Sequence, residues 1–134
     1  MRCVRPLTVD AIIPVDGRIV FIHRGHEPFK GRLALPGGFV EADETTEQAV
    51  VREGKEETGL ETAVVRLIGV YSEPGRDPRG PTVSVCYLLR KTGGTLRAGS
   101  DAAAAELIAP DAVPALAFDH NRMVDDARLS GAFR

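Results

Sequence analysis

The chain has 134 residues, a length typical of one domain that is large enough to bury a hydrophobic core. Its 17 basic and 19 acidic residues give a formal net charge of −2, which argues against general binding to nucleic acid or to membrane surfaces. Its apolar runs are shorter than the ~18 residues that a membrane-spanning helix needs, and its two cysteines are too few for a disulfide framework. We therefore expect a single cytoplasmic domain over residues 1–134.

The first forty residues predict short strands joined by turns. β-Branched and apolar side chains predict strands at Leu7–Pro14 and Arg18–Arg24, and a short extended piece at Leu33–Leu35. The residues between and after these segments are rich in turn formers. Turns or loops are expected at Asp16-Gly17, at Gly25–Arg32 and at Pro36-Gly37-Gly38.

A helix is predicted from Thr45 or Thr46 to Thr58. Thr45 and Gln48 have the spacing of a capping box, in which side chains and backbone exchange hydrogen bonds at the helix N-terminus. Gly59 is a favourable residue for ending the helix, because glycine adopts left-handed backbone angles without strain. Gly54 falls inside the helix, where glycine costs up to about 1 kcal/mol relative to alanine.

The second half of the chain predicts two strands and a closing helix. The strands are expected at Ala63–Tyr71 and Pro81–Arg90, and the helix at Asp119–Leu129 with Asp119 as its N-cap. The other segments are expected to be a loop at Ser72–Gly80, a hairpin and loop at Thr92–Gly99, an ambiguous stretch at Ala102–Ala105, a short strand at Glu106–Ala109 and a turn at Pro110–Pro114. Strands mixed with two helices predict an α/β fold in which helices cover a mixed sheet.

The first predicted helix carries three glutamates on one face. At about 100° per residue, Glu53, Glu56 and Glu57 fall within roughly a third of the helix circumference, where like charges repel one another. A divalent cation would neutralise them, and hard cations such as Mg²⁺ take carboxylate oxygens as ligands while also binding substrate phosphates. A solvated acidic surface helix is the alternative for such a cluster taken alone.

The spacing around these acids resembles the Nudix box, the signature of hydrolases that act on a nucleoside diphosphate linked to another group. It reads Gly38, five residues, Glu44, seven residues, Arg52-Glu53, one residue, Lys55-Glu56-Glu57, one residue and Gly59-Leu60. Agreement at this many positions makes a chance match improbable. Gly54 departs from the pattern, since the family usually has an aliphatic residue there. The resemblance implies an α/β/α sandwich built on a mixed β-sheet.

The resemblance also implies the metal ligands. Glu53, Glu56 and Glu57 would bind Mg²⁺, or alternatively Mn²⁺, together with the backbone carbonyl of Gly38. Either Glu56 or Glu57 would activate the attacking water. Arg52 would orient a carboxylate through charge-assisted hydrogen bonds, with an ordinary surface ion pair as the alternative.

Some members of the family place the catalytic base outside the box. Glu106 is the stronger candidate in this chain for that role or for an additional metal ligand, and Asp101 is the weaker one. For both residues an ordinary surface acid is the alternative.

Three further segments, PFKGRLALPGGFVE, YSEPGRDPRG and LAFDH, are similar to the ADP-ribose pyrophosphatase branch of these hydrolases. Arg24, Arg76 and Arg79 are candidates for binding substrate phosphates, with a solvated surface position as the alternative. The aromatic side chains available for stacking on adenine are Phe29, Tyr71 and Phe118, although core packing is the more common role for such residues.

The resemblance therefore implies hydrolysis of ADP-ribose to AMP and ribose 5-phosphate, with a small nucleotide as partner rather than nucleic acid or membrane. A MutT-like hydrolase of normal or oxidised nucleoside triphosphates is one alternative. A non-catalytic ADP-ribose sensor is another, and it is disfavoured because every acid of the box is present and no DNA-binding segment is expected in the chain. The resemblance also implies a homodimer. Other ADP-sugars and dinucleotides, the identity of the base and the number of metal ions stay open.

Overall fold

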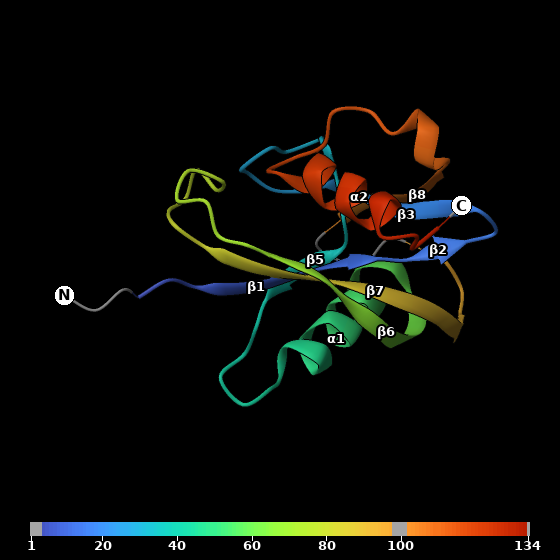
Figure 1. Ribbon diagram of the computed structural model, residues 1–134, viewed down its shortest axis with the longest axis horizontal. Coiled ribbons are helices and arrows are strands. Elements are labelled where there is room, and N and C mark those ends of the chain that lie inside the picture. The colour runs from blue at the N-terminus through green and yellow to red at the C-terminus, as the bar shows by residue number, and fades with distance from the viewer. Residues whose placement is uncertain (1–3, 98–101, 134) are drawn as a thin grey trace.

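Two helices lie on opposite sides of a central β-sheet in the computed structural model, which describes residues 4–97 and 102–133 (Figure 1). The sheet has the strand order β5-β1-β7-β6. These strands are β1 (Leu7–Ile12), β5 (Gly37–Phe39), β6 (Leu60–Tyr71) and β7 (Val83–Gly94). Strands β1 and β7 run parallel and the other pairs run antiparallel, so the expected mixed sheet and α/β/α arrangement are confirmed.

A second, smaller sheet is centred on β3 and was not foreseen as a separate unit. Its strands are β2 (Pro14–Val15), β3 (Arg18–Arg24), β4 (Leu33–Ala34) and β8 (Ala102–Ile108), and β3 pairs with the other three. The stretch Ala102–Ala105, which sequence left ambiguous, is part of β8 because it pairs with Ile22, His23 and Arg24. Alanine has little strand preference of its own, so the pairing partner decides its conformation.

Helix α1 (Thr46–Thr58) begins and ends as the sequence predicts. The Gln48 backbone N–H donates to Thr45 Oγ1 (3.1 Å), and the Thr45 N–H donates to Gln48 Oε1 (2.8 Å), which completes the capping box. Gly59 follows in a left-handed conformation with a φ of 76°.

Helix α2 (His120–Leu129) follows a short 3₁₀ turn, η1 (Pro110–Ala112). Asp119 occupies the N-cap position of α2 as predicted, but its side chain makes no capping hydrogen bond. Both Asp119 carboxylate oxygens accept hydrogen bonds from Arg76 instead, at 2.9 and 2.7 Å.

Two other expectations need correction. The segment Pro36-Gly37-Gly38 is not a free turn, because Gly37–Phe39 forms the edge strand β5 against β1. The expected hairpin within Thr92–Gly99 is also wrong, since β7 continues to Gly94 and pairs there with Leu60 at the start of β6. Gly99 lies outside the described residues.

Strand β1 of the central sheet is buried on both faces, so its side chains alternate between the two cores. Ala11 and Ile13 pack in the cluster that lies against α1, whereas Ile12 packs in the cluster that contains Met123 and Val124 of α2. This alternation follows from the two-residue period of a strand. Cys86 is buried in the second cluster, and burial raises the pKa of its thiol, as expected for an inert cysteine. Neither helix of the described chain is long and apolar enough to cross a membrane.

Candidate active site

A cavity of about 510 Å³ opens between α1, the strands β1 and β5, the end of β3 and the segments that precede β7 and α2. Charged side chains of both signs line it. The acidic ones are Asp10, Glu27, Glu41, Glu53, Glu57 and Asp77, and the basic or imidazole ones are Arg24, His26, Arg76, Arg79 and His120. Carboxylates and guanidinium groups therefore face one shared space, as binding of a cation together with an anion requires.

Helix α1 presents Glu53 and Glu57 to this cavity, four residues and about one turn apart. The Gly37 backbone N–H donates to Glu57 Oε1 (3.2 Å). A Cβ atom placed on Gly38 would lie 2.6 Å from the Glu53 carboxylate, closer than real side chains allow. Gly38 is therefore needed so that the Glu53 carboxylate can approach the backbone of β5.

Glu53 and Glu57 bind their protons more tightly than an ordinary glutamate does. Burial raises the pKa of Glu57 to about 8, and the nearby charge of Glu53 adds to this effect. Burial also raises the pKa of Glu53, against the opposing influence of Arg52. Because burial raises the pKa of Glu57 to about 8, Glu57 retains its proton near neutral pH when no cation is bound.

The donors at this position fit a hard divalent cation. Glu53 and Glu57 supply carboxylate oxygens, and Gly38 borders the same cavity. Within residues 4–97 and 102–133, no three His, Cys, Asp or Glu side chains are gathered closely enough to hold a metal as they stand. Glu56, the third predicted ligand, is 56% exposed, and its Oε2 accepts a hydrogen bond from Arg52 (3.2 Å). Glu56 must therefore leave Arg52 before it can act as a metal ligand.

Arg52 occupies the orienting position that the sequence predicts. Its Nη1 donates to Glu53 Oε1 (2.9 Å), while Nε and Nη2 donate to the two carboxylate oxygens of Glu44, at 3.0 and 2.6 Å. The hydrogen bonds from Arg52 lower the pKa of Glu44 to about 2. A bidentate arginine–carboxylate pair has a defined direction, so Glu44 holds Arg52 in place and Arg52 holds Glu53.

Glu106 does not reach the cavity. Its Oε2 lies 2.8 Å from His23 Nε2, in a pair that is partly open to solvent. On β8, Ile108 packs with the α2 cluster and Leu107 with the α1 cluster. Because side chains alternate along a strand, Glu106 shares the face of Ile108, away from α1. The other candidate, Asp101, lies outside the described residues.

The three predicted arginines all border the cavity but differ in their freedom. The Arg76 side chain is 3% exposed and is held by Asp119 and by Thr82 Oγ1 (2.8 Å). Arg79 is 42% exposed, and its Nε and Nη2 donate to Asp77 at 3.1 and 2.9 Å. Arg76 is therefore fixed in the wall of the cavity, whereas Arg79 is more accessible, and Arg24 is held by a hydrogen bond from its Nε to the Pro28 carbonyl oxygen (2.6 Å).

The predicted aromatic residues differ in whether they line the cavity or pack in the core. Phe118 lines the cavity, whereas Tyr71 lies in the α2-side core, where its hydroxyl donates to Asp126 Oδ2 (2.7 Å). Phe29 packs edge-on against Phe118 with 4.9 Å between ring centroids. Phe39 on β5 also lines the cavity and was not foreseen.

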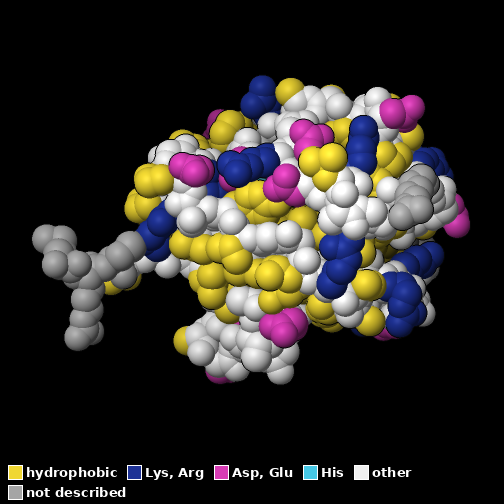
Figure 2. All heavy atoms as spheres, viewed as in Figure 1, with side chains coloured by type: hydrophobic (Ala, Val, Ile, Leu, Met, Phe, Trp, Pro, Cys, Tyr) yellow, Lys and Arg dark blue, Asp and Glu magenta, His cyan; other side chains and the backbone are white. Residues whose placement is uncertain are grey.

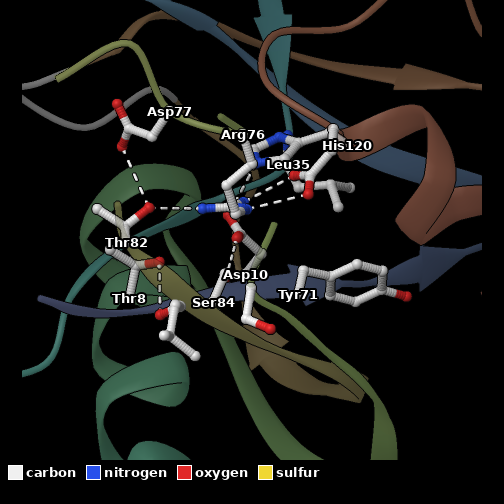
Figure 3. Close-up of polar contacts among 12 residues, drawn as sticks. Thr8, Asp10, Leu35, Tyr71, Arg76, Asp77, Thr82, Ser84 and His120 are labelled. Atoms are coloured by element: carbon white, nitrogen blue, oxygen red, sulfur yellow. Dashed lines mark hydrogen bonds and ion pairs between the residues drawn. The ribbon is translucent and has the colours of Figure 1, made fainter. Parts of the chain in front are cut away.

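A buried pair, Asp10 and His120, was missed as part of the site (Figure 3). The Leu35 N–H donates to His120 Nδ1 (3.0 Å), so the imidazole carries its proton on Nε2, which lies 3.3 Å from Asp10 Oδ1. Ser84 Oγ donates to the other oxygen of Asp10. A charged residue inside the apolar run LTVDAIIP was the available signal, because unpaired charges are rarely buried.

The Asp10–His120 pair supports the glycine segment that contacts the α1 carboxylates. A Cβ atom placed on Gly37 would lie 2.5 Å from Asp10 Oδ1 and would also collide with the Val9 carbonyl oxygen. Asp10 therefore lies between His120 and Gly37, and the Gly37 N–H donates to Glu57. On another side of the cavity, Thr82 Oγ1 accepts from Arg76 and donates to Asp77, as Figure 3 shows.

Comparison with known proteins identifies relatives of the chain. The family model of the NUDIX domain matches residues 4–127. The ADP-ribose pyrophosphatase of Methanocaldococcus jannaschii is 53% identical over 120 residues, which make up 90% of this chain and 71% of that protein.

Two solved structures share the fold over nearly the whole chain. The NUDIX domain of Shewanella oneidensis NrtR, complexed with ADP-ribose, has a TM-score of 0.83 and 27% identity, over 96% of this chain and 90% of that one. A bifunctional NMN adenylyltransferase/ADP-ribose pyrophosphatase of Francisella tularensis, complexed with AMP and a manganese ion, has a TM-score of 0.80 and 27% identity. The match covers 94% of this chain and 42% of the Francisella chain.

Proposed function

The chain belongs to the Nudix family, and on this premise we propose that it is a hydrolase that converts ADP-ribose and water to AMP and ribose 5-phosphate. The observation that carries the proposal is the cavity in which Glu53 and Glu57 of α1 face Arg24 and Arg79. The 53% identity to the Methanocaldococcus ADP-ribose pyrophosphatase supports the choice of substrate.

Glu53 and Glu57, with the Gly38 carbonyl and with Glu56 once it leaves Arg52, are the proposed ligands of Mg²⁺ or Mn²⁺. When bound, the cation neutralises the pyrophosphate and polarises a phosphoryl oxygen. The manganese ion in the Francisella neighbour supports a divalent cation in this family. Arg52 holds Glu53 in the direction that binding requires.

Water attacks one phosphorus, and the bond from that phosphorus to the bridging oxygen breaks, so that the other phosphate leaves. Either Glu56 or Glu57 accepts the proton of the attacking water. Burial raises the pKa of Glu57 to about 8 in the metal-free protein, and a bound cation would lower it again, so that the ionised carboxylate could accept the proton. Arg24 and Arg79 bind the substrate phosphates, while Arg76 positions the loop that carries Arg79.

Hydrolysis of a substrate panel tests this function. The panel contains ADP-ribose, other ADP-sugars, NADH, diadenosine polyphosphates, dNTPs and 8-oxo-dGTP, each with Mg²⁺ and with a chelator. We expect chelator-sensitive turnover with a preference for ADP-ribose and with AMP as a product. If the protein instead prefers nucleoside triphosphates and releases pyrophosphate, its function is that of a MutT-like enzyme and the ADP-ribose proposal is wrong.

A sensor is the second candidate, because the Shewanella NrtR domain has the same fold and was solved with ADP-ribose. Tight binding of ADP-ribose without turnover of any compound in the panel would favour it. The carboxylate pair on α1 argues for hydrolysis, since a pure sensor has no need of a buried and a half-buried glutamate with raised pKa values.

We further propose a homodimer that is located in the cytoplasm. The edge strand β6 exposes Val65, Leu67 and Val70, each about half accessible. Figure 2 shows hydrophobic side chains gathered across the middle of the face on which Figure 1 draws β6 and β7. Exposed apolar residues of this kind mark association surfaces. The buried free thiol of Cys86 supports a reducing compartment.

A further inference from the structure

An arginine that does not line the cavity binds both ends of the loop 72–82, which joins β6 to β7. Arg5 Nη2 donates to the carbonyl oxygens of Ser72 (2.6 Å) and Thr82 (3.0 Å). Its Nε donates to the carbonyl oxygen of Pro81 (3.2 Å). One guanidinium group therefore links the start of the loop to its end, across more than sixty residues of sequence on either side.

The loop leaves the central sheet where the pairing of β6 with β7 ends. Tyr71 and Ser84 form the last pair at this end, and the described residues 72–82 form turns and bends rather than a helix or a strand. The Val83 N–H donates to the Pro6 carbonyl oxygen (3.0 Å), so the segment that carries the arginine lies beside the end of the loop (Figure 1). Carbonyl groups beyond the last strand pair need other donors, and a planar guanidinium group serves several at once.

The base of the loop is connected to Arg79 through Thr82 and Asp77. Thr82 Oγ1 donates to Asp77 Oδ2 (3.4 Å), and the Asp77 side chain is only 1% exposed. Asp77 Oδ1 accepts from the backbone N–H of Arg79 (2.9 Å) and from its Nε (3.1 Å), while Oδ2 accepts from Nη2 (2.9 Å). Burial by itself would raise the pKa of Asp77, but these hydrogen bonds hold it below its usual value. A buried carboxylate that contacts the base of the loop therefore sets the direction of Arg79.

The guanidinium group of Arg79 lies against two aromatic rings that belong to other segments. Its Cζ is 5.1 Å from the centroid of the Phe39 ring on β5 and 5.7 Å from that of the Phe118 ring, which precedes α2. Both rings line the cavity. Because cation–π contacts require the charge to stay within about 6 Å of the ring, a small displacement of the loop would move Arg79 away from both.

We propose that Arg5 is a positioning residue for substrate binding, which fixes the base of the loop 72–82 and so holds Arg79 at the cavity. The effect on substrate affinity rests on the proposed function, in which Arg79 binds a substrate phosphate. Arg76 remains bound to Asp119 when Arg5 is removed, so the loop should loosen at its base without unfolding the protein. Misplacement of a binding group by about 1 Å, caused far from the chemistry, is enough to impair an enzyme strongly.

Steady-state kinetics with ADP-ribose tests this role. For Arg5→Gln, which removes the charge and the planar fork, we expect KM to rise about tenfold while kcat stays within about twofold, because the acids of α1 are unchanged. Arg5→Lys keeps the charge but not the fork, so KM should rise by a smaller factor of about three. Arg18→Gln removes the same charge from an exposed position at the start of β3 and should leave both constants unchanged.

Amide hydrogen exchange in EDTA, without substrate, measures whether the loop is released. Within the loop, the Arg76 N–H donates to the Glu73 carbonyl oxygen (3.1 Å) and the Gly80 N–H donates to that of Asp77 (3.2 Å). In Arg5→Gln these two amides should exchange about tenfold faster than in the parent protein. The amides of α1 should exchange at the parent rate, because the substitution leaves the rest of the fold intact.

Unchanged KM in both Arg5 variants would overturn the proposal, and so would exchange that accelerates in α1 as much as in the loop, which indicates a general loss of stability. Failure of this inference and failure of the proposed function remain distinguishable. Turnover of ADP-ribose by the parent protein, with unchanged KM and loop exchange in Arg5→Gln, rejects the role of Arg5 alone. Faster loop exchange in Arg5→Gln, in a protein that hydrolyses no compound of the panel, rejects the hydrolase and keeps Arg5 as the residue that fixes the loop.

Discussion

At the scale of single residues, the candidate site depends on carboxyl groups whose burial disfavours their charged form. Glu53 and Glu57 lie four residues apart on α1, and the second is buried with a pKa raised to about 8. Gly38 makes room for one carboxylate and Gly37 donates to the other. Such an arrangement lowers the stability of the metal-free protein, and a bound cation would recover the loss.

We expect Glu53→Gln and Glu57→Gln each to reduce turnover of ADP-ribose by at least about 100-fold, because the amide carries no charge for a metal ion. Circular dichroism should show an unchanged fold. Glu61→Gln is the matched control, since Glu61 lies at an exposed position where it pairs with Lys55 (2.9 Å). Near-normal turnover in both variants would remove these residues from the metal site.

The raised pKa of Glu57 also predicts how stability depends on pH. In the unfolded chain this carboxyl group titrates near its ordinary value of 4.5, and in the metal-free folded protein near 8. The folded state therefore binds the extra proton between these values, and its advantage is fully present below pH 4.5. The free energy of unfolding should fall as pH rises toward 8, by on the order of 3 kcal/mol.

Urea unfolding in EDTA at pH values from 5 to 9 measures this dependence. Glu57→Gln should flatten the curve, because the amide does not titrate. Addition of Mg²⁺ at pH 8.5 should raise the stability of the parent protein and not that of the variant. A parent curve that is flat or rises with pH in this range would show that Glu57 ionises normally.

At the scale of elements, α1 combines strong local signals with one weak position. Its capping box and C-terminal glycine are both formed, yet Gly54 lies buried in its middle. A Cβ atom placed there would lie 3.8 Å from Ile13 Cδ1 and 3.9 Å from Leu89 Cδ1, which are ordinary contact distances. Close packing therefore does not explain the glycine at this point of the described chain.

We predict that Gly54→Ala stabilises the protein by about 0.5–1 kcal/mol, because alanine reduces the freedom of the unfolded chain and fits the space available. Chemical denaturation measures the change, and turnover should be unaffected. Gly38→Ala is the contrasting substitution, since its Cβ would meet the Glu53 carboxylate at 2.6 Å, and it should reduce turnover. Destabilisation by Gly54→Ala would show that the helix cannot accept even a methyl group.

At the scale of the whole molecule, the central sheet leaves β6 as an edge. An exposed apolar edge strand is prone to pair with another chain, and natural proteins usually protect it with charge. On β6 the residues Val65, Leu67 and Val70 remain exposed. A dimer formed over this edge would cover them.

Sedimentation of the parent protein and of a Val65→Lys/Val70→Lys variant tests the dimer. We expect the parent to be dimeric at micromolar concentration and the variant to be monomeric. Leu129→Lys, which changes a residue that is 86% exposed on α2, serves as the control and should remain dimeric. A monomeric parent, or a variant that stays dimeric, would place the interface elsewhere or exclude it.

Sequence alone determined the features that depend on neighbours along the chain. Thr45, Gln48 and Gly59 set the ends of α1 because helix capping joins residues three to five positions apart. The same local spacing places Glu53 and Glu57 on one face and supports assignment to the Nudix family. Strand positions followed from apolar patterns, although strand ends and the split into two sheets did not.

Tertiary structure decided what depends on residues that are distant in the chain. Asp10 accepts a hydrogen bond from Ser84, and His120 accepts one from the Leu35 N–H. Arg76 binds the Asp119 carboxylate, which therefore does not cap α2. The pairing of β8 with β3 turned Glu106 away from the cavity and toward His23. These contacts form between residues that are distant in the chain, so local sequence patterns do not predict them. Leaving a charge unpaired in the interior costs more free energy than a local preference such as helix capping contributes.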